Sequence, residues 1–293
     1  MDSLVALVTG GSSGIGRESV LALQAGGATV YAAARREMPD LQARGVRALA
    51  MDVTDEDSLQ AGVSRILDET GRIDVLVNNA GYGSYGAIED VPMAEARRQF
   101  DVNVFGAMRL TQLILPTMIA QGRGRIINIS SMGGRFSMAL GGWYHATKYA
   151  VEALSDALRQ EVRPFGIEVV LVEPGLIHTE WTKIAADHLL ATSGMGKYAV
   201  IAENFAAALR LAGPGTASDP SVIGRTVARA ATCAHPRTRY RKGLGAIPLT
   251  VLTDLLPDRV YDAGVRLLLT HLGGLIGLIG SPTRSAVTVN RPG

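Results

Sequence analysis

Cysteine and surplus charge are both nearly missing from this chain. Of its 293 residues one is a cysteine, Cys233, which excludes an internal disulfide. The formal net charge of +2 lies too near balance to favour nucleic acid or an anionic membrane as a partner. The first residues, MDSLVALVTGG, contain no basic segment of the kind that opens a secretory signal. We therefore expect a cytoplasmic protein without a nucleic-acid partner.

Long apolar runs are missing as well. A spanning helix needs about 20 consecutive apolar residues, and the nearest candidate, residues 267–280, is shorter and broken by glycines. We therefore expect no membrane-spanning segment. Residues 244–293 are predicted to form a C-terminal helical extension and tail. The alternatives for its apolar, glycine-rich segment are packing on a neighbouring subunit, lying on a membrane surface and covering part of the active site. The segment lacks a basic face, which disfavours the membrane surface.

What the chain does contain is a regular alternation of short apolar runs and amphipathic stretches. Strands are predicted at residues 4–10, 28–35, 46–53, 73–81, 124–131 and 167–175, with a last one at 238–243. Helices are predicted between them, among them 16–27, 55–71 and 92–122, the last as one long helix or two in sequence. Short apolar strands separated by helices form parallel sheets that are covered on both faces. The predicted fold is α/β, a Rossmann-type doubly wound parallel sheet with helices on both faces, in a single domain.

A glycine-rich loop follows the first predicted strand and precedes a helix. The loop, TGGSSGIG at residues 9–16, lets the chain turn sharply and lets a pyrophosphate approach backbone N–H groups at the helix N-terminus. Such a loop also occurs as an ordinary turn, but the strand before it and the helix after it favour nucleotide binding. The predicted cofactor contacts here are Gly10, Ser12, Ser13, Gly14, Ile15 and Gly16.

The end of the second predicted strand selects the cofactor. An acidic residue at this place binds the ribose 2′-hydroxyl of NAD, whereas an arginine accommodates the 2′-phosphate of NADP. Arg35 and Arg36 stand here, and no acid appears before Glu37. We therefore expect NADP(H) to be preferred over NADH, with two solvated surface arginines as the alternative. Asp52, followed by Val53, is predicted either to hold the adenine amino group or to be a turn or capping residue.

Four motifs in order resemble those of the short-chain dehydrogenase/reductase family, in its main single-domain branch. They are TGGSSGIG at 9–16, NNAG at 78–81, a serine after the fifth predicted strand, and YHATK at 144–148. The pair Pro174 and Gly175 followed by Thr179 also matches, so that the resemblance covers residues 4–243. It implies that residues 1–243 form a dinucleotide-binding catalytic domain, in which residues 176–216 cover the substrate.

The resemblance implies a catalytic tetrad of Asn103, Ser131, Tyr144 and Lys148, with Ser130 as the fallback for the serine. Tyr144 is expected to give a proton to a carbonyl oxygen. The usual pKa of a tyrosine is about 10, and Lys148, one helical turn away, is expected to lower it and to bind the nicotinamide ribose. Ser131 is expected to hydrogen-bond the substrate oxygen, and Asn103 to hold a water that relays protons to Lys148.

The resemblance also implies cofactor contacts beyond the glycine loop. These are Asn78, Asn79, Ala80, Gly81, Tyr144, Lys148, Pro174, Gly175, Ile177 and Thr179. His145 and His178 flank the expected site without the spacing of a metal-ligand pair, so we assign no metal. Family members commonly form a homodimer or a homotetramer, and we expect one of these.

The expected activity is hydride transfer between NADP(H) and a ketone or secondary alcohol. Apolar residues around the motifs favour an apolar substrate that is steroid-, retinoid- or ketone-like: Met132, Phe136, Met138, Leu140, Trp143, Trp181 and residues 184–211. A 3-oxoacyl-thioester reductase is one alternative, in which the basic residues 235–243 would meet an acidic carrier protein. A nucleotide-sensing binding protein on the same scaffold is another, but it would be expected to lose members of the tetrad.

Overall fold

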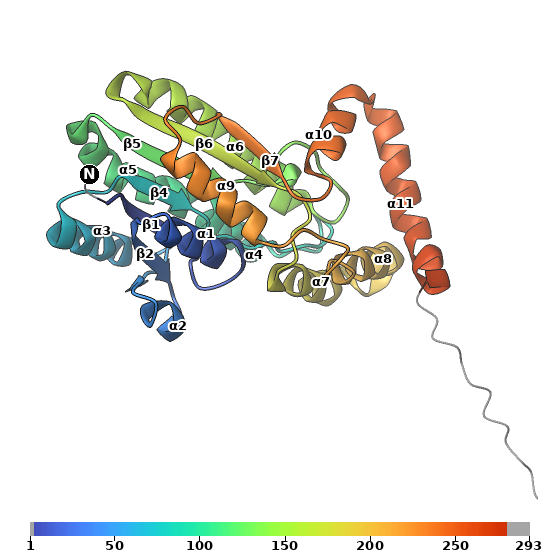
Figure 1. The fold of residues 1–293 in the computed structure, drawn as a ribbon. Helices are drawn as coiled ribbons and strands as arrows, with labels where there is room; N and C mark the ends of the chain where they lie inside the picture. The colour runs from blue at the N-terminus through green and yellow to red at the C-terminus, as the bar shows by residue number, and fades with distance from the viewer. Residues whose placement is uncertain (1–2, 280–293) are drawn as a thin grey trace, which may run out of the picture.

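The computed structural model describes residues 3–279, and their side chains as far as residue 270. It is built on a seven-stranded sheet in the order β3-β2-β1-β4-β5-β6-β7, in which every neighbouring pair is parallel (Figure 1). The strands are β1 (Val5–Thr9), β2 (Thr29–Ala34), β3 (Arg47–Ala50), β4 (Val75–Asn78), β5 (Gly124–Ile129), β6 (Ile167–Pro174) and β7 (Arg239–Lys242). The predicted strands and the doubly wound α/β fold are confirmed, with strand ends that differ by at most three residues.

Strands β1 to β6 each contribute to two apolar cores, because successive side chains of a strand point to opposite faces of the sheet. In β1, Ala6 and Val8 pack on one side with Ile223, whereas Leu7 packs on the other side with Leu110. Helices α1 (Gly14–Ala25) and α9 (Ser221–Thr232) cover the first face. Helices α3 (Glu56–Thr70), α5 (Gly106–Gln121) and α6 (Gly142–Val162) cover the second.

The remaining elements lie at the ends of the sheet. They are α2 (Pro39–Gln42), α4 (Met93–Phe100), the short turns η2 (Met132–Gly134), η3 (Arg163–Phe165) and η4 (Gly196–Tyr198), and the helices α7 (Glu180–Ser193), α8 (Ala199–Arg210), α10 (Ala246–Leu255) and α11 (Asp258–Ile279). In Figure 1, α7 and α8 stand beyond one end of the strands, and α11 runs beside α8 at the edge of the molecule. The extension predicted after residue 243 is thus helical over the described residues, and residues 280–293 lie outside them.

The predicted helix at 92–122 is one continuous helix whose winding changes in the middle. Helices α4 and α5 are joined by a π-helical turn, η1 (Asp101–Phe105). Among the described helices this one, Met93–Gln121, is long and apolar enough to cross a bilayer by length and composition, whereas the nearest candidate in the sequence was residues 267–280. Its Leu110, Ile114 and Met118 are buried against the sheet, which is the packing of a core helix.

Candidate active site

Most of the predicted site residues surround one cavity of about 550 Å³ at the carboxyl ends of the central strands. This is the place where α/β sheets of this topology bind ligands, because the strand order reverses between β1 and β4. The predicted residues that line the cavity are Gly10, Ser12, Ser13, Gly14, Ile15, Gly16, Arg36, Asn79, Ala80, Gly81, Ser131, Tyr144, Lys148, Pro174, Gly175, Ile177 and Thr179.

The glycine loop and the end of β4 are bound tightly to each other. The Asn79 amide donates to the carbonyl oxygens of Thr9 at 2.9 Å and of Gly10 at 3.2 Å. The Thr9 hydroxyl accepts from the backbone N–H groups of Asn79 and Ala80, each at 3.0 Å. A Cβ on Gly16 would lie 2.1 Å from the Gly10 carbonyl oxygen, so no other residue fits there without a shift of the backbone.

The loop fits a phosphate group. Helix α1 follows the loop directly, and the N-capping residue Ser13 makes no side-chain hydrogen bond to its first turn. The N–H groups of that turn therefore keep their hydrogen-bonding capacity at the positive end of the helix dipole. Glycine at 10 and 14, both with positive φ, leaves the approach to them open. A pyrophosphate is the ligand that such a cradle suits.

The two arginines after β2 have different surroundings. The Arg36 Nε donates to the Ser12 hydroxyl at 2.7 Å, and Arg36 lines the cavity. The side chain of Arg35 is 70% exposed, lies 4.0 Å from the Asp52 carboxylate and does not line the cavity. Of the pair, Arg36 is thus the one placed beside the glycine loop.

Asp52 and Val53 also lie away from the cavity lining. The Asp52 carboxylate accepts from the backbone N–H and the hydroxyl of Thr54, at 2.9 and 2.8 Å. Burial on its own would raise the pKa of Asp52, but these hydrogen bonds and the nearby Arg35 charge lower it overall. The geometry is that of a turn aspartate, the second of the two interpretations that the sequence left open.

Tyr144 and Lys148 lie one turn apart on α6, both almost fully buried. Burial raises the pKa of Tyr144 to about 12, and a hydrogen bond with Ser131 acts in the opposite direction. The Lys148 Nζ lies 6.0 Å from the centre of the Tyr144 ring and donates to the Ile129 carbonyl oxygen at 3.0 Å. The expected lowering of the Tyr144 pKa by Lys148 is not seen in the protein alone: burial and the Ser131 hydrogen bond are the effects that act on this pKa, and burial is the larger.

Asn103 is hydrogen-bonded to Tyr82 and Thr147, next to the cavity. It lies in the π turn η1, and its amide N–H groups donate to the Tyr82 carbonyl oxygen at 2.8 Å and the Thr147 hydroxyl at 3.1 Å. Its amide oxygen accepts from the Tyr82 N–H at 3.0 Å. Asn103 does not line the cavity. Since both of its donors are used, the side chain has only acceptor capacity left for a relay water.

The apolar walls were predicted in part. Met132, Phe136, Met138, Trp181 and Ile184 line the cavity. Leu140 and Trp143 do not: Leu140 is buried in the neighbouring apolar cluster, with the left-handed backbone angle φ of +66°. The Leu140 carbonyl oxygen accepts from the Gly86 N–H at 2.7 Å, which holds this conformation.

Tyr85 is the main residue that the sequence did not reveal. Its buried ring lies 5.4 Å from the ring of Tyr144, 5.9 Å from Trp181 and 5.5 Å from Phe205. It follows NNAG in a stretch without helical or strand periodicity, so that no pattern marked it. The one available signal was an aromatic residue close behind a cofactor motif.

The two histidines differ in position. His145 lines the cavity, and its Nδ1 lies 2.9 Å from the Gly133 carbonyl oxygen. Because a carbonyl can only accept, Nδ1 carries the proton, and the buried Nε2 is an acceptor without a partner among the described residues. Burial lowers the pKa of His145. His178 bonds to the Ala212 carbonyl oxygen and does not line the cavity. That no metal is bound stays a prediction.

The basic stretch 235–243 does not form a patch at the cavity. Arg239 lies 3.2 Å from Glu152 and 2.5 Å from Asp156, and Arg241 lies 2.9 Å from the fully buried Glu173. No residue of this stretch, all of which the structure describes, lines the cavity. These arginines are thus held in ion pairs with α6 and β6. They do not form the basic patch at the cavity entrance that the carrier-protein alternative predicted.

Comparison with known proteins gives the same assignment. The family described as short chain dehydrogenase matches residues 4–189. A 3-ketodihydrosphingosine reductase from Bacteroides thetaiotaomicron is 34% identical over 270 residues, which cover 91% of this chain and 98% of the relative. An NADPH-dependent 3-dehydrocapnine reductase from Ornithobacterium rhinotracheale is 40% identical over 190 residues, covering 61% and 67%.

A solved structure agrees over nearly the whole chain. The crystal structure of a short-chain dehydrogenase from Streptomyces avermitilis matches with a TM-score of 0.75 and 33% identity, covering 96% of this chain and 100% of the other. The sheet order, the cavity at its carboxyl edge and these likenesses lead to one conclusion. The chain is an oxidoreductase of the short-chain dehydrogenase/reductase family.

Proposed function

We propose that the protein is an NADPH-dependent reductase of a ketone in an apolar or amphipathic molecule, with 1–243 as its catalytic domain. The observation that carries the proposal is one cavity with two ends of different chemistry. Arg36 and the glycine loop form one end, and Ser131, Tyr144 and Lys148 lie among the apolar residues Trp181 and Phe136 at the other. The first end suits a phosphate-rich nucleotide, and the second suits a carbonyl on an apolar body.

Each catalytic side chain has one role in this proposal. The bound NADPH supplies a hydride to the carbonyl carbon. Tyr144, whose pKa of about 12 keeps its proton in place at neutral pH, donates that proton to the carbonyl oxygen. The Ser131 hydroxyl donates a hydrogen bond to the same oxygen, where negative charge develops. Lys148 supplies a positive charge 6.0 Å from the Tyr144 ring, which stabilises the phenolate that is left.

The nature of the substrate is supported by the relatives. The names of these two relatives state reduction at a 3-keto or 3-dehydro position, and dihydrosphingosine is a long-chain base. NADPH is named for one of them. The aromatic wall around Tyr144 suits an alkyl body, and Arg36 beside Ser12 suits a 2′-phosphate. A ketone on a long alkyl chain is the class that we propose first, ahead of steroids and retinoids.

The test is NADPH oxidation against a panel of carbonyl compounds. The panel contains long-chain 3-keto bases, 2-alkanones, steroids, retinal and 3-oxoacyl thioesters, with Tyr144→Phe as the parallel variant. We expect turnover of the long-chain ketones and a loss of more than about a hundredfold in Tyr144→Phe, since general acid catalysis contributes about 10²–10⁴-fold. NADPH binding to the variant, measured by fluorescence, should be retained.

Two results would contradict the proposal. Turnover that survives in Tyr144→Phe would remove Tyr144 as the proton donor. Tight NADPH binding without turnover of any ketone would favour the nucleotide-sensing alternative.

A further inference from the structure

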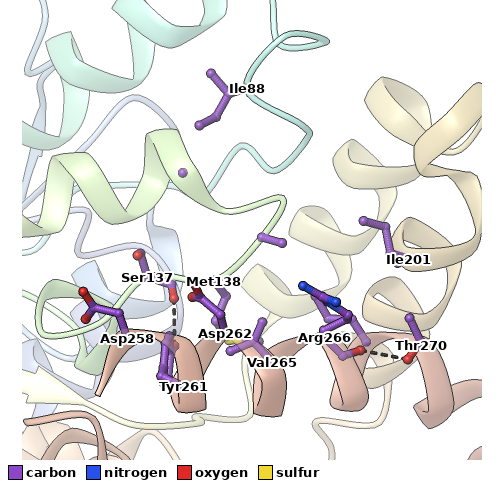
Figure 2. A pocket seen from close by; sticks show the side chains of 13 residues that line it. Ile88, Ser137, Met138, Ile201, Asp258, Tyr261, Asp262, Val265, Arg266 and Thr270 are labelled. Carbon is purple, nitrogen blue, oxygen red and sulfur yellow. Dashed lines mark hydrogen bonds between the residues drawn. The ribbon is translucent and has the colours of Figure 1, made fainter. Parts of the chain in front are cut away.

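A second hollow, of about 680 Å³, lies between α11 and the loop that leads into α6. We call it the α11 groove. Figure 2 shows α11 along its lower side, Ser137 and Met138 of the loop above it, Ile88 opposite and Ile201 on α8. Its lining residues are Ile88, Ser137, Met138, Ala139, Gly142, Ile201, Asp258, Tyr261, Asp262, Val265, Arg266, Leu269 and Thr270.

The α11 groove has an apolar floor and a polar rim. Val265 and Leu269 of α11 pack on the apolar cluster of the core, with Ile201 beside them. Asp262 and Arg266, from the same helix, are exposed. An alkyl chain that lies lengthwise in such a groove buries its surface on the floor and leaves the charged groups of the rim in water.

The groove and the catalytic cavity are neighbours that share one lining residue. Met138 lines both spaces. Tyr144 and Leu269 also belong to one apolar cluster, so that the floor of the groove and the wall around the catalytic tyrosine are packed together. Methionine has an unbranched and flexible side chain, so the residue between the two spaces is one that can change its rotamer easily.

A long substrate has to leave the catalytic cavity. The same cavity of about 550 Å³ is lined by the glycine loop and Arg36, so a nucleotide takes up much of it. A carbonyl held between Ser131 and Tyr144 then leaves little room for a long chain. Met138 separates this cavity from the α11 groove, because it lines both.

We propose that the α11 groove is the tail subsite of this enzyme and takes the alkyl chain of a ketone whose carbonyl lies at Tyr144. The inference rests on the proposed function. Two hydrogen bonds hold α11 in the position that this subsite needs. The Tyr261 hydroxyl donates to the Ser137 carbonyl oxygen at 2.7 Å, and the Asn204 amide donates to the Leu269 carbonyl oxygen at 2.7 Å. Figure 2 shows the first of these bonds beside Met138.

The test measures how kcat/KM depends on the chain length of the ketone when the groove is open and when it is filled. The kcat/KM for NADPH-dependent reduction is measured with 2-alkanones from 2-octanone to 2-hexadecanone in the full chain. The test variants are Ile88→Trp and Val265→Trp, which place an indole in the groove from opposite walls. The matched control is Leu268→Trp, because Leu268 lies on α11, is 47% exposed and does not line the groove.

We expect kcat/KM to rise with chain length in the unchanged protein and in the control. Both groove variants should lose about tenfold or more of the ratio between the longest and the shortest ketone, as expected for several methylene groups that lose a pocket. Two variants are used because Val265 packs on the core, whereas Ile88 is 69% exposed and tolerates change. A ratio that stays unchanged in Ile88→Trp would overturn the inference.

A binding measurement separates this inference from the proposed function. The probe is cis-parinaryl alcohol, a neutral fluorescent long-chain alcohol, added to the protein with saturating NADP⁺, so that a nucleotide occupies its end of the catalytic cavity. Binding that is weakened at least about tenfold in Ile88→Trp and not in Leu268→Trp supports the tail subsite, whatever the outcome of the turnover assay. Equal binding to all three proteins would overturn it.

Discussion

At the residue scale, Lys148 is subject to two opposing effects. Burial lowers the pKa of Lys148 to about 8, and the neighbouring charge of Glu152 raises it. Glu152 itself is buried, accepts from Arg239 at 3.2 Å and has a second carboxylate oxygen without a hydrogen bond from the described residues. The charge of Lys148 near neutral pH therefore depends on Glu152, one turn further along α6.

This balance predicts a pH dependence of the reduction. Lys148 is protonated below pH 8 and loses its charge above it, so kcat/KM, which reports the free enzyme, should fall as the pH rises through about 8. Tyr144, with a pKa of about 12, stays protonated over this range and does not cause the fall. Glu152→Gln should move the midpoint to lower pH, since it removes the charge that supports Lys148.

The control for this measurement is Glu168→Gln, because Glu168 pairs with Arg125 at 3.3 Å and is not among the charges that act on Lys148. A midpoint that is the same in Glu152→Gln as in the unchanged protein would show that Lys148 does not depend on Glu152.

Arg36 and Arg35 provide a second prediction at this scale. Arg36→Ala should raise the KM for NADPH by about 10- to 100-fold, because a charged hydrogen bond to phosphate contributes about 1.5–3 kcal/mol. The KM for NADH should change far less. Arg35→Ala is the matched control and should change either value by less than about twofold, since its side chain is mostly exposed and away from the cavity. Equal effects of the two variants would contradict the assignment of Arg36.

At the scale of elements, the loop between η2 and α6 holds a strained leucine. Leu140 has a φ of +66°, which costs a residue with a Cβ about 1–2 kcal/mol, and its buried side chain offsets this by packing beside Tyr85 and Tyr144. The loop carries Met138, and so a well-fixed Leu140 also fixes the residue between the cavity and the α11 groove.

This strain predicts an unusual order of stability. Leu140→Ala loses the apolar packing and keeps the strained angle, and it should lower the free energy of unfolding by about 2–5 kcal/mol. Leu140→Gly loses slightly more packing but is free of the strain, so it should be the more stable of the two by about 1 kcal/mol. Urea unfolding measures both values. A glycine variant less stable than the alanine variant would mean that the leucine is not strained.

The elements also show which structural features sequence patterns predict and which they do not. Strands β1 to β6 were predictable because each lies in a short apolar run between stretches of helical periodicity, whereas β7, with the sequence RYRK, is largely charged. The π turn around Asn103 was not, because no periodicity distinguishes one residue of extra winding from an ordinary long helix. The spacing of Tyr144 and Lys148 predicted their shared helix face, but not the burial that sets their pKa values.

At the scale of the whole molecule, contacts between distant segments decided what the sequence left open. Sequence patterns do not distinguish Arg35 from Arg36. The structure does, because Arg36 donates a hydrogen bond to Ser12 of the glycine loop. Tyr85 enters the site because α7 and α8 bring Trp181 and Phe205 against it. The basic residues 239 and 241 belong to an ion-pair cluster with Glu152 and Glu173, which no local pattern marks.

The sheet order has a consequence for how this chain folds. The central strand β1 lies between β2 and β4, and its Val5 N–H donates to the Asp74 carboxylate, 69 residues further along. During synthesis one edge of β1 therefore stays unpaired until β4 has been made. One edge of β6 likewise stays unpaired until β7 has been made. Parallel pairing over such separations is slow, because loop closure has to precede the contacts that reward it. The catalytic cavity is lined by residues at or after the ends of β1, β2, β4, β5 and β6, so the newly made chain acquires the capacity to bind a nucleotide only after β6 has been made.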